Sequence, residues 1–217
     1  MGRISLLGVC VPAALSLLLG ACAGDRAHAV RVSVPEQRMT VFRHGQPVAS
    51  YPVSTSKFGV GDVPGSNCTP LGEMAVAQKI GAGAPQGMKF KSRQPTGEIV
   101  AVNAPGRDPI VTRILWLRGL EGCNANAFER MIYIHGTPEE ARMGTPASYG
   151  CIRMRSKDIT QLFDILGKGA RVIVSNTPAP VPQAAQELAA NSSDPGEAGQ
   201  NRVDSPMPVR TAVSIRD

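Results

Sequence analysis

The sequence contains few aromatic residues and no recognisable metal-binding motif. Phe, Trp and Tyr make up 4% of the 217 residues, whereas 23 Gly and 18 Pro favour turns and short strands over long helical packing. No CxxC or HxxxH spacing is present, and "GAGAP" lacks the strand-to-helix context of a phosphate-binding loop. We therefore expect no cofactor and no metal, which disfavours a zinc site built from Cys68, Cys123, Cys151 and His135.

Blocks of consecutive basic residues are also missing, although the chain is basic. The formal charge is +6 and the isoelectric point is near 9.3. This spread of charge favours a solvated surface over a face that binds nucleic acid. The length, with 42% hydrophobic residues, suits one globular domain plus tails.

The N-terminal stretch "MGRISLLGVCVPAALSLLLGAC" has the pattern of an export signal. A basic start at Arg3 precedes an apolar run over 4–19, which is too short and too early for a comfortable membrane-spanning anchor. We therefore expect residues 1–21 to be a signal peptide and residues 22–29 a linker. The protein would then be exported to the cell envelope or periplasm.

Two processing sites follow the apolar run. The sequence "LGAC" at 19–22 resembles a bacterial lipobox, in which Cys22 would be lipidated and become the mature N-terminus. The sequence "AHA" at 27–29 is an A-x-A site that a general signal peptidase could cut. We favour the lipobox because it abuts the apolar run, and lipidation would hold the protein on a membrane.

Export also changes how the five cysteines are interpreted. Cys10 would leave with the signal and Cys22 would be modified, so Cys68, Cys123 and Cys151 remain. An odd number outside the cytoplasm suggests one functional thiol and one possible pair. A Cys68–Cys123 disulfide is allowed in that compartment, but the sequence does not establish the distance between them.

Short apolar segments separated by Gly- and Pro-rich turns predict a mainly β domain over 30–175. His44-Gly45-Gln46 predicts a hairpin turn, and "GAGAPQGMKFKSRQPTG" at 81–97 predicts a long surface loop. The Pro/Ala/Ser-rich composition of 176–217 predicts a disordered tail. Strands are expected within 30–34, 39–55, 72–80, 98–102, 109–118, 130–135 and 170–175.

One helix is predicted, shortly after Cys151. Ser156 is its expected N-cap, Asp158 in the first turn suits the helix dipole, and Gly167 or Gly169 would end it. Apolar residues recur at i, i+3, i+4 and i+7: Ile159, Leu162, Phe163 and Leu166.

Cys151 and His135 are the candidates for nucleophilic catalysis. A thiol attacks a carbonyl as thiolate, so it needs a partner that takes its proton and later returns one to the leaving amine. Imidazole can do both near neutral pH. Of the three histidines, only His44 and His135 lie within the expected domain, and His44 lies in a turn that we expect to be exposed, which leaves His135. Gly150 would let substrate approach the backbone, where amides could stabilise an oxyanion. In the alternative interpretation, Cys151 and His135 are ordinary buried residues.

The surrounding motifs resemble those of a known enzyme family. "HGT" and "SYGCIRM", followed by the acid-capped helix, resemble the active-site segment of bacterial L,D-transpeptidases. The likeness extends to the opening hairpin, "CTPLGEM" and "RILWLRGLE", and covers roughly 30–175. It implies an L,D-transpeptidase-like β-sandwich with one helix after the cysteine, acting on peptidoglycan stem peptides.

The resemblance also implies roles for individual residues. Cys151 would be the nucleophile that attacks the carbonyl of a diaminoacyl residue in its bond to the following D-alanine. His135 would be the proton acceptor and donor, with the backbone carbonyl of Gly136 orienting its imidazole. Amides at Gly150 and Cys151 would form the oxyanion hole.

Three further residues are assigned to substrate binding. Ser148 fits the family's Ser/Thr position and would brace the loop. Arg153 would bind substrate carboxylates or hold the loop, unless it only pairs with an acid such as Asp158. Tyr149 departs from the family pattern S/T-H-G-C, and its hydroxyl could keep the hydrogen-bonding role, or its ring could form a wall near the substrate.

The resemblance implies a thioester on Cys151 and release of D-alanine. The acceptor could be an amine of another stem peptide, which gives a 3→3 cross-link, a lysine of a wall-anchored lipoprotein, or water. The alternatives are a carboxypeptidase or other hydrolase on the same scaffold, and a wall-binding lipoprotein weakened by Tyr149. A sortase-like enzyme is more distant, because its histidine would lie much further upstream.

Overall fold

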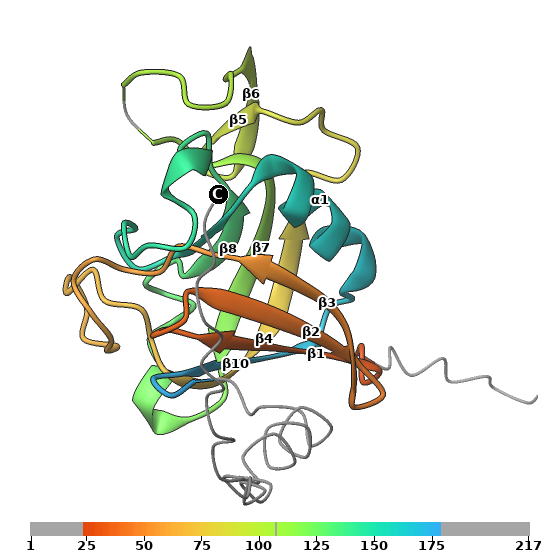
Figure 1. The fold of residues 1–217 in the computed structure, drawn as a ribbon, viewed down its shortest axis with the longest axis vertical. Helices are drawn as coiled ribbons and strands as arrows, with labels where there is room; N and C mark the ends of the chain where they lie inside the picture. Colours follow the sequence, from red (N-terminus) through yellow and green to blue (C-terminus); the bar gives the residue numbers. More distant parts are fainter. Residues whose placement is uncertain (1–23, 107, 179–217) are drawn as a thin grey trace, which may run out of the picture. The chain divides into compact units, whose positions relative to one another are not determined.

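The computed structural model describes residues 24–106 and 108–178 (Figure 1). The predicted signal peptide, the lipidation site at Cys22 and residues 179–217 of the predicted tail lie outside the described residues. Within the described ranges, no helix has the length and apolar character needed to cross a membrane.

The described part is mainly β with one α-helix, as the sequence predicted. Helix α1 covers Ser156–Ile165, and short 3-10 turns cover Gly122–Asn124 and Glu140–Arg142. The strands are β1 His28–Ser33, β2 Arg38–Arg43, β3 Gln46–Pro52, β4 Gly72–Ile80, β5 Met88–Lys91, β6 Gln94–Ile99, β7 Val111–Gly119, β8 Tyr133–Gly136, β9 Ile152–Met154 and β10 Arg171–Ser175.

All ten strands join in one sheet, in the order β3-β2-β1-β10-β4-β7-β5-β6. Strand β8 pairs with β7 and carries β9 on its other side. Most neighbours are antiparallel, but β1 runs parallel to β10 and β8 runs parallel to β9. Figure 1 shows the β5–β6 hairpin at the opposite end of the sheet from β1–β3.

The predicted turn at His44 is confirmed. His44 and Gly45 both have positive φ, 49° and 80°, which is the conformation of a two-residue turn whose twist matches the flanking strands. The hairpin puts Met39 and Val41 of β2 into the core, where both are fully buried.

The loop predicted for 81–97 is wrong over its second half. Strands β5 and β6 form a hairpin there, closed by Ser92 and Arg93, which both adopt positive φ of 50° and 67°. Turns of this type usually carry Gly or Asn, so the sequence lacked the usual signal. The strand expected over 98–102 retains only Glu98 and Ile99, as the end of β6.

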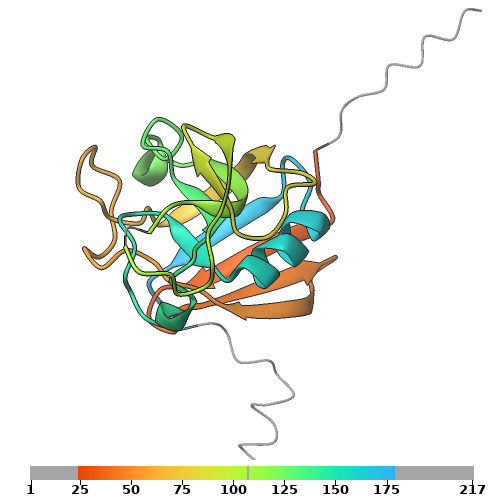
Figure 2. The same ribbon diagram turned by 90° about the horizontal axis from the view of Figure 1, so that it is seen from above.

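Helix α1 is confirmed, but its N-terminus differs from the prediction. Arg155 is the N-cap, and the Ser156 amide donates to the Glu140 carboxylate at 2.8 Å. The Ser156 hydroxyl instead accepts a hydrogen bond from Thr112 at 2.8 Å, which ties the helix to β7. In Figure 2, α1 lies beside the strands β1–β3, and Tyr51 of β3 donates to Gln161 of the helix at 3.3 Å.

The apolar face of α1 packs into the main core. Ile159, Leu162 and Leu166 are fully buried with side chains of β1, β2, β4, β7 and β10. A second, smaller cluster joins Phe90 of β5, Ile114 of β7 and Tyr133 of β8, and Cys151 packs against it. The thiol therefore lies where the sheet meets the β5–β6 hairpin.

The folded part extends beyond the expected limits of 30 and 175. The Asp25 carboxylate accepts a hydrogen bond from the Gly167 amide at 2.7 Å and pairs with His28 at 3.0 Å. At the other end, the Thr177 carbonyl accepts from Ser33 at 3.0 Å. These flanks are short and polar, so no hydrophobic pattern marked them.

Candidate active site

Strands β8 and β9 bring the two candidate catalytic residues to one face. Their parallel register pairs Ile134 with Ile152 and His135 with Arg153. Side chains alternate along a strand, so His135 of β8 shares a face with Arg153 and with Cys151, which immediately precedes β9. His135 lies on β8 and Cys151 lies directly before the adjacent, hydrogen-bonded strand β9, although the two residues are 16 positions apart in the sequence.

The imidazole of His135 is buried and fixed in one orientation. Its exposed fraction is 4%, and Nδ1 lies 2.8 Å from the Gly136 carbonyl oxygen. Because a carbonyl only accepts, Nδ1 carries the proton and Nε2 of the neutral ring keeps a free lone pair. Burial lowers the pKa of His135, and this outweighs the hydrogen bond to Gly136, which raises it.

The thiol of Cys151 is protonated in the free protein. Burial raises its pKa to about 11, against the lowering effects of the Tyr133 backbone, Arg130 and Arg153. The Sγ–H donates to the Met131 carbonyl at 3.5 Å. Among the described residues, no hydrogen bond joins Sγ to His135. Each side chain instead donates to a different backbone carbonyl, Cys151 to that of Met131 and His135 to that of Gly136.

Ser148 organises the loop that carries the thiol. Its hydroxyl donates to the Cys151 carbonyl at 2.6 Å and accepts from the Gly150 amide at 3.2 Å. The Gly150 carbonyl in turn accepts from Thr69 at 3.0 Å. Ser148 is 2% exposed, so the structure places it as an internal brace, away from solvent.

Gly150 occupies a position that a side chain would strain. Its φ is +115°, and an added Cβ would lie 3.2 Å from the Cys68 carbonyl oxygen and 3.4 Å from Ile132. The backbone of 67–68 thus packs directly on the glycine before the thiol. Only glycine meets both demands without displacement.

We expect Gly150→Ala to destabilise the protein by about 1–3 kcal/mol, because strained backbone and close contact add. Thermal unfolding would measure this. Gly65→Ala is the matched control, since Gly65 also has positive φ, +78°, but has nothing within 4 Å of an added Cβ. Equal losses for the two variants would contradict the role assigned to close packing at Gly150.

Arg153 is buried and already paired. It is 2% exposed, and its guanidinium contacts the carboxylates of Asp108 and, at 2.9 Å, Glu139. Asp158, the partner considered from sequence, is not among these acids. The Asp108 carboxylate also accepts from Thr137, so it links the start of β7 to the end of β8. This arrangement holds the loops around the site together.

Tyr149 points outward beside Lys57 and Phe58. The residue is 64% exposed, and its hydroxyl accepts a hydrogen bond from Lys57 Nζ at 3.0 Å. Its ring lies 5.4 Å from the ring of Phe58. The hydrogen bond from Lys57 lowers the pKa of the Tyr149 phenol.

A cleft of about 470 Å³ opens next to Tyr149. It is unusually rich in charge, because three basic and two acidic side chains contribute to it. Its charged and aromatic lining residues are Lys57, Asp108, Glu139, Arg142, Tyr149 and Arg153. Tyr149 and Arg153 flank Cys151 in sequence, so this cleft borders the loop of the thiol.

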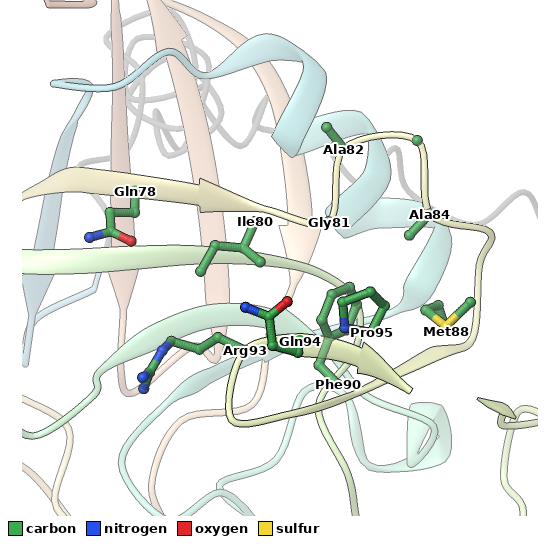
Figure 3. Close-up of a pocket in the computed structure, with 11 residues that line it drawn as sticks. Gln78, Ile80, Gly81, Ala82, Ala84, Met88, Phe90, Arg93, Gln94 and Pro95 are labelled. Carbon is green, nitrogen blue, oxygen red and sulfur yellow. The ribbon is translucent and has the colours of Figure 1, made fainter. Parts of the chain in front are cut away.

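A second cavity, of about 640 Å³, lies between β4 and the β5–β6 hairpin. Gln78 and Ile80 of β4 lie on one side, and Gln94 and Pro95 of the hairpin lie on the other (Figure 3). Phe90 also lines this cavity and belongs to the cluster against which Cys151 packs. The hairpin that the sequence did not predict therefore forms one wall of a cavity on the thiol's side.

The other two cysteines of the described part are free. Cys68 Sγ contacts the Phe58 carbonyl at 3.2 Å, and Cys123 lies beside the Glu121 carboxylate at 3.5 Å. Within residues 24–106 and 108–178, no group of three or more His, Cys, Asp and Glu side chains is arranged to hold a metal ion.

Several residues around the site had no sequence signal. Asp108 and Glu139 reach Arg153 from separate loops, and the Met131 carbonyl accepts a hydrogen bond from the Cys151 thiol. Lys57 lies far from Tyr149 in the chain. Isolated charged residues in loops have no periodicity, so only the folded chain shows that they meet.

The sequence is similar to those of known proteins. Residues 27–174 match the family model YkuD, described as an L,D-transpeptidase catalytic domain. The Bacillus subtilis YkuD protein is 32% identical over 88 residues, which cover 40% of this chain and 48% of that protein. Bacillus licheniformis YkuD is 31% identical over the same shares. The match thus spans about half the length of these curated relatives.

Solved structures show more distant similarity. L,D-transpeptidase 3 from Mycobacterium tuberculosis, in complex with a faropenem-derived adduct, is 18% identical with a TM-score of 0.46. The match covers 69% of this chain and 60% of the chain in that structure. LdtMt1 in complex with imipenem is 20% identical with a TM-score of 0.44, over 69% of this chain and 59% of its own.

Proposed function

Because the chain belongs to the YkuD family of L,D-transpeptidase catalytic domains, we propose that it is a cysteine transpeptidase acting on peptidoglycan stem peptides. One observation carries the assignment of roles. The Gly136 carbonyl fixes Nδ1 of His135 as a donor, which leaves Nε2 as a proton acceptor on the face that bears Cys151. This geometry supports the proposed roles of Cys151 as nucleophile and His135 as base.

The first half-reaction forms a thioester. Cys151 Sγ attacks the carbonyl carbon of the diaminoacyl residue while its proton moves to Nε2 of His135. The S–C bond forms and an oxyanion develops. When the oxyanion collapses, the C–N bond to D-alanine breaks, and the imidazolium returns the proton to the departing amine. D-alanine leaves and the acyl group stays on sulfur.

The second half-reaction restores the thiol. An amine attacks the thioester and loses a proton to His135. As the C–S bond breaks, the new amide forms and the imidazolium returns the proton to the departing sulfur of Cys151. We propose an amine of a second stem peptide as acceptor, which gives a 3→3 cross-link. A lysine of a wall-anchored lipoprotein would give attachment of that protein, and water would give a carboxypeptidase.

The resting site is a neutral thiol beside a neutral imidazole. The raised pKa of Cys151 and the lowered pKa of His135 both oppose a standing ion pair. The thiol must therefore leave the Met131 carbonyl and transfer its proton as attack begins. Arg130 and Arg153 favour the charge that develops on sulfur, because both lower the pKa of the thiol.

In this proposal the amides of Gly150 and Cys151 both stabilise the oxyanion, but they contribute unequally. The Gly150 amide already donates to the Ser148 hydroxyl, so its proton is shared. We assign the larger contribution to the Cys151 amide, which adjoins the attacking sulfur. Ser148 acts by holding the loop.

The pH dependence of D-alanine release should reflect the neutral form of His135. Burial lowers its pKa below the ordinary value of 6.5, so the neutral, active form persists to lower pH. We expect kcat/KM for D-alanine release to stay constant from pH 8 down to about 6.5 and to fall only below that value. An acid limb above pH 6.5 would contradict the role of buried, neutral His135.

Product analysis tests the proposed function. The purified protein would be incubated with tetrapeptide muropeptides, and the products separated and weighed by mass spectrometry, alongside Cys151→Ala. Release of D-alanine with a cross-linked dimer, absent in the variant, is the expected result. D-alanine without a dimer would make water the acceptor. No change in either sample, and no carbapenem adduct on the wild type, would favour a wall-binding lipoprotein.

We also propose that the protein is an exported lipoprotein of the cell envelope, anchored through Cys22. One structural feature supports cleavage at Cys22 over cleavage after Ala29. Cleavage after Ala29 would remove Asp25 and the first residues of β1 together with their hydrogen bonds. Membrane fractionation of wild type and Cys22→Ala tests this, and equal membrane association of both would contradict it.

A further inference from the structure

Lys57 is held against the loop that carries the thiol. Its amide donates to the Ser148 carbonyl at 3.1 Å, and the Ser148 amide donates to Thr55 at 2.9 Å. Three residues before Lys57, the backbones of Ser54 and Arg153 donate hydrogen bonds to each other, at 3.0 and 2.9 Å. The segment before Lys57 therefore runs alongside 148–153, and the backbone of Lys57 is fixed next to the nucleophile loop.

The side chain of Lys57 is positioned by two exposed aromatic rings. Its ammonium lies 4.4 Å from the ring centroid of Tyr149 and 5.2 Å from that of Phe58, while it donates to the Tyr149 hydroxyl. Phe58 and Tyr149 are 48% and 64% exposed, so the rings face solvent. An ammonium has three donors, and one of them is used by Tyr149.

Among the described charged residues that line the cleft, Lys57 is the cation that forms no ion pair with a carboxylate. Arg153 is neutralised by Asp108 and Glu139, and Arg142 lies 3.3 Å from Glu139 as well. No carboxylate of the described residues pairs with Lys57. The cleft beside the thiol therefore presents one cation that is oriented, accessible and unneutralised.

We propose that Lys57 binds a carboxylate of the acyl-donor peptide in a subsite that Tyr149 lines and in which Phe58 packs beside the ammonium. The inference rests on the proposed function. It transfers the carboxylate-binding role from Arg153, which is buried and paired, to Lys57 in the same cleft. The proposal also assigns a role to Tyr149. Its hydroxyl accepts a hydrogen bond from the Lys57 ammonium and would orient this group towards the cleft.

Kinetics with paired substrates would test the subsite. Lys57→Met removes the charge and keeps most of the apolar stem, and Lys157→Met, on the exposed face of α1, is the matched control for net charge. With a tetrapeptide whose carboxylates are free, we expect Lys57→Met to lower kcat/KM roughly 10-fold, mainly through KM. With the same peptide fully amidated, Lys57→Met should match wild type. An equal loss on both peptides would overturn the proposal.

Two further comparisons locate the carboxylate. Peptides amidated only at the terminal D-alanine, or only at the side chain of the diamino acid, separate the two sources. The amidation that abolishes the Lys57 effect identifies the bound group. Tyr149→Phe keeps the ring and removes the hydroxyl, so a loss smaller than that of Lys57→Met is expected with the free peptide.

A binding measurement separates this proposal from the proposed function. Calorimetry would compare tetrapeptide binding to Cys151→Ala with binding to Cys151→Ala/Lys57→Met, so no turnover is needed. Weaker binding of the double variant to the free but not the amidated peptide would support the subsite even if wild type turns nothing over. Equal binding of both variants to the free peptide would overturn the subsite even if the transpeptidase reaction is observed.

Discussion

Cys151→Ala is expected to lower kcat/KM for D-alanine release by at least about 10⁴-fold, because no acyl-enzyme can form without the nucleophile. Residual activity would come only from binding and oxyanion stabilisation. The measurement is release of D-alanine from a tetrapeptide under conditions in which wild type completes many turnovers. The small side chain packs at the edge of the second cluster, so the fold should persist.

The two other thiols of the described part provide matched controls. Cys68→Ala and Cys123→Ala remove thiols that, among the described residues, form no hydrogen bond with His135. Cys68 contacts the carbonyls of Phe58 and Ser66, and Cys123 contacts the Leu71 carbonyl and the Glu121 carboxylate. Both variants should keep activity within a few-fold of wild type. Activity of Cys151→Ala above one-tenth of wild type would contradict the assignment of the nucleophile, and loss of activity in Cys68→Ala alone would move it to Cys68.

Arg153→Met is expected to destabilise the protein by about 3 kcal/mol, since removing one partner of a buried ion pair leaves uncompensated charge. The side chain of Arg153 is 3% exposed, while Asp108 and Glu139 are 21% and 26% exposed. The partial exposure of both acids keeps the expected loss at the lower end for buried pairs. Equilibrium unfolding in urea would measure the change.

Arg142→Met is the control for this prediction. Arg142 pairs with the same Glu139 carboxylate, but its side chain is 59% exposed. Exposed pairs contribute about 0–1 kcal/mol, so its loss should be small. A similar loss for the two variants would show that Arg153 does not hold the loops of 108 and 139 together, and would return Arg153 to the candidates for substrate binding.

Periodic patterns in the sequence predicted most of the fold. The short apolar run of β7 and the apolar stripe of α1 are local, and both elements occur where they were expected. The β5–β6 hairpin was missed because Ser92 and Arg93 adopt a turn conformation that usually selects Gly or Asn. Its residues also carry no clear alternation, since β6 is exposed along its whole length.

The candidate site also contains residues that the sequence predicted and residues that it could not predict. Cys151 and His135 stand out because their side chains are chemically distinctive and their flanking residues match a family motif. The register of β8 and β9 then places them together. Lys57 and Asp108 could not be predicted, because each meets its partner only through contacts between loops distant in sequence. Burial, which sets the pKa of Cys151 and His135, is equally a property of the whole fold.

The central claim is that Cys151 carries the acyl group, and trapping that intermediate tests it most directly. The protein would be mixed with a tetrapeptide whose side-chain amine is acetylated, so that no amine acceptor is present. The reaction would be quenched in acid within the first turnover, and the protein digested and mapped by mass spectrometry. The account predicts that the peptide containing Cys151 gains the mass of the tetrapeptide minus D-alanine, as a thioester that hydroxylamine removes. Release of D-alanine with no such adduct, or with the adduct on Cys68 or Cys123, would contradict it.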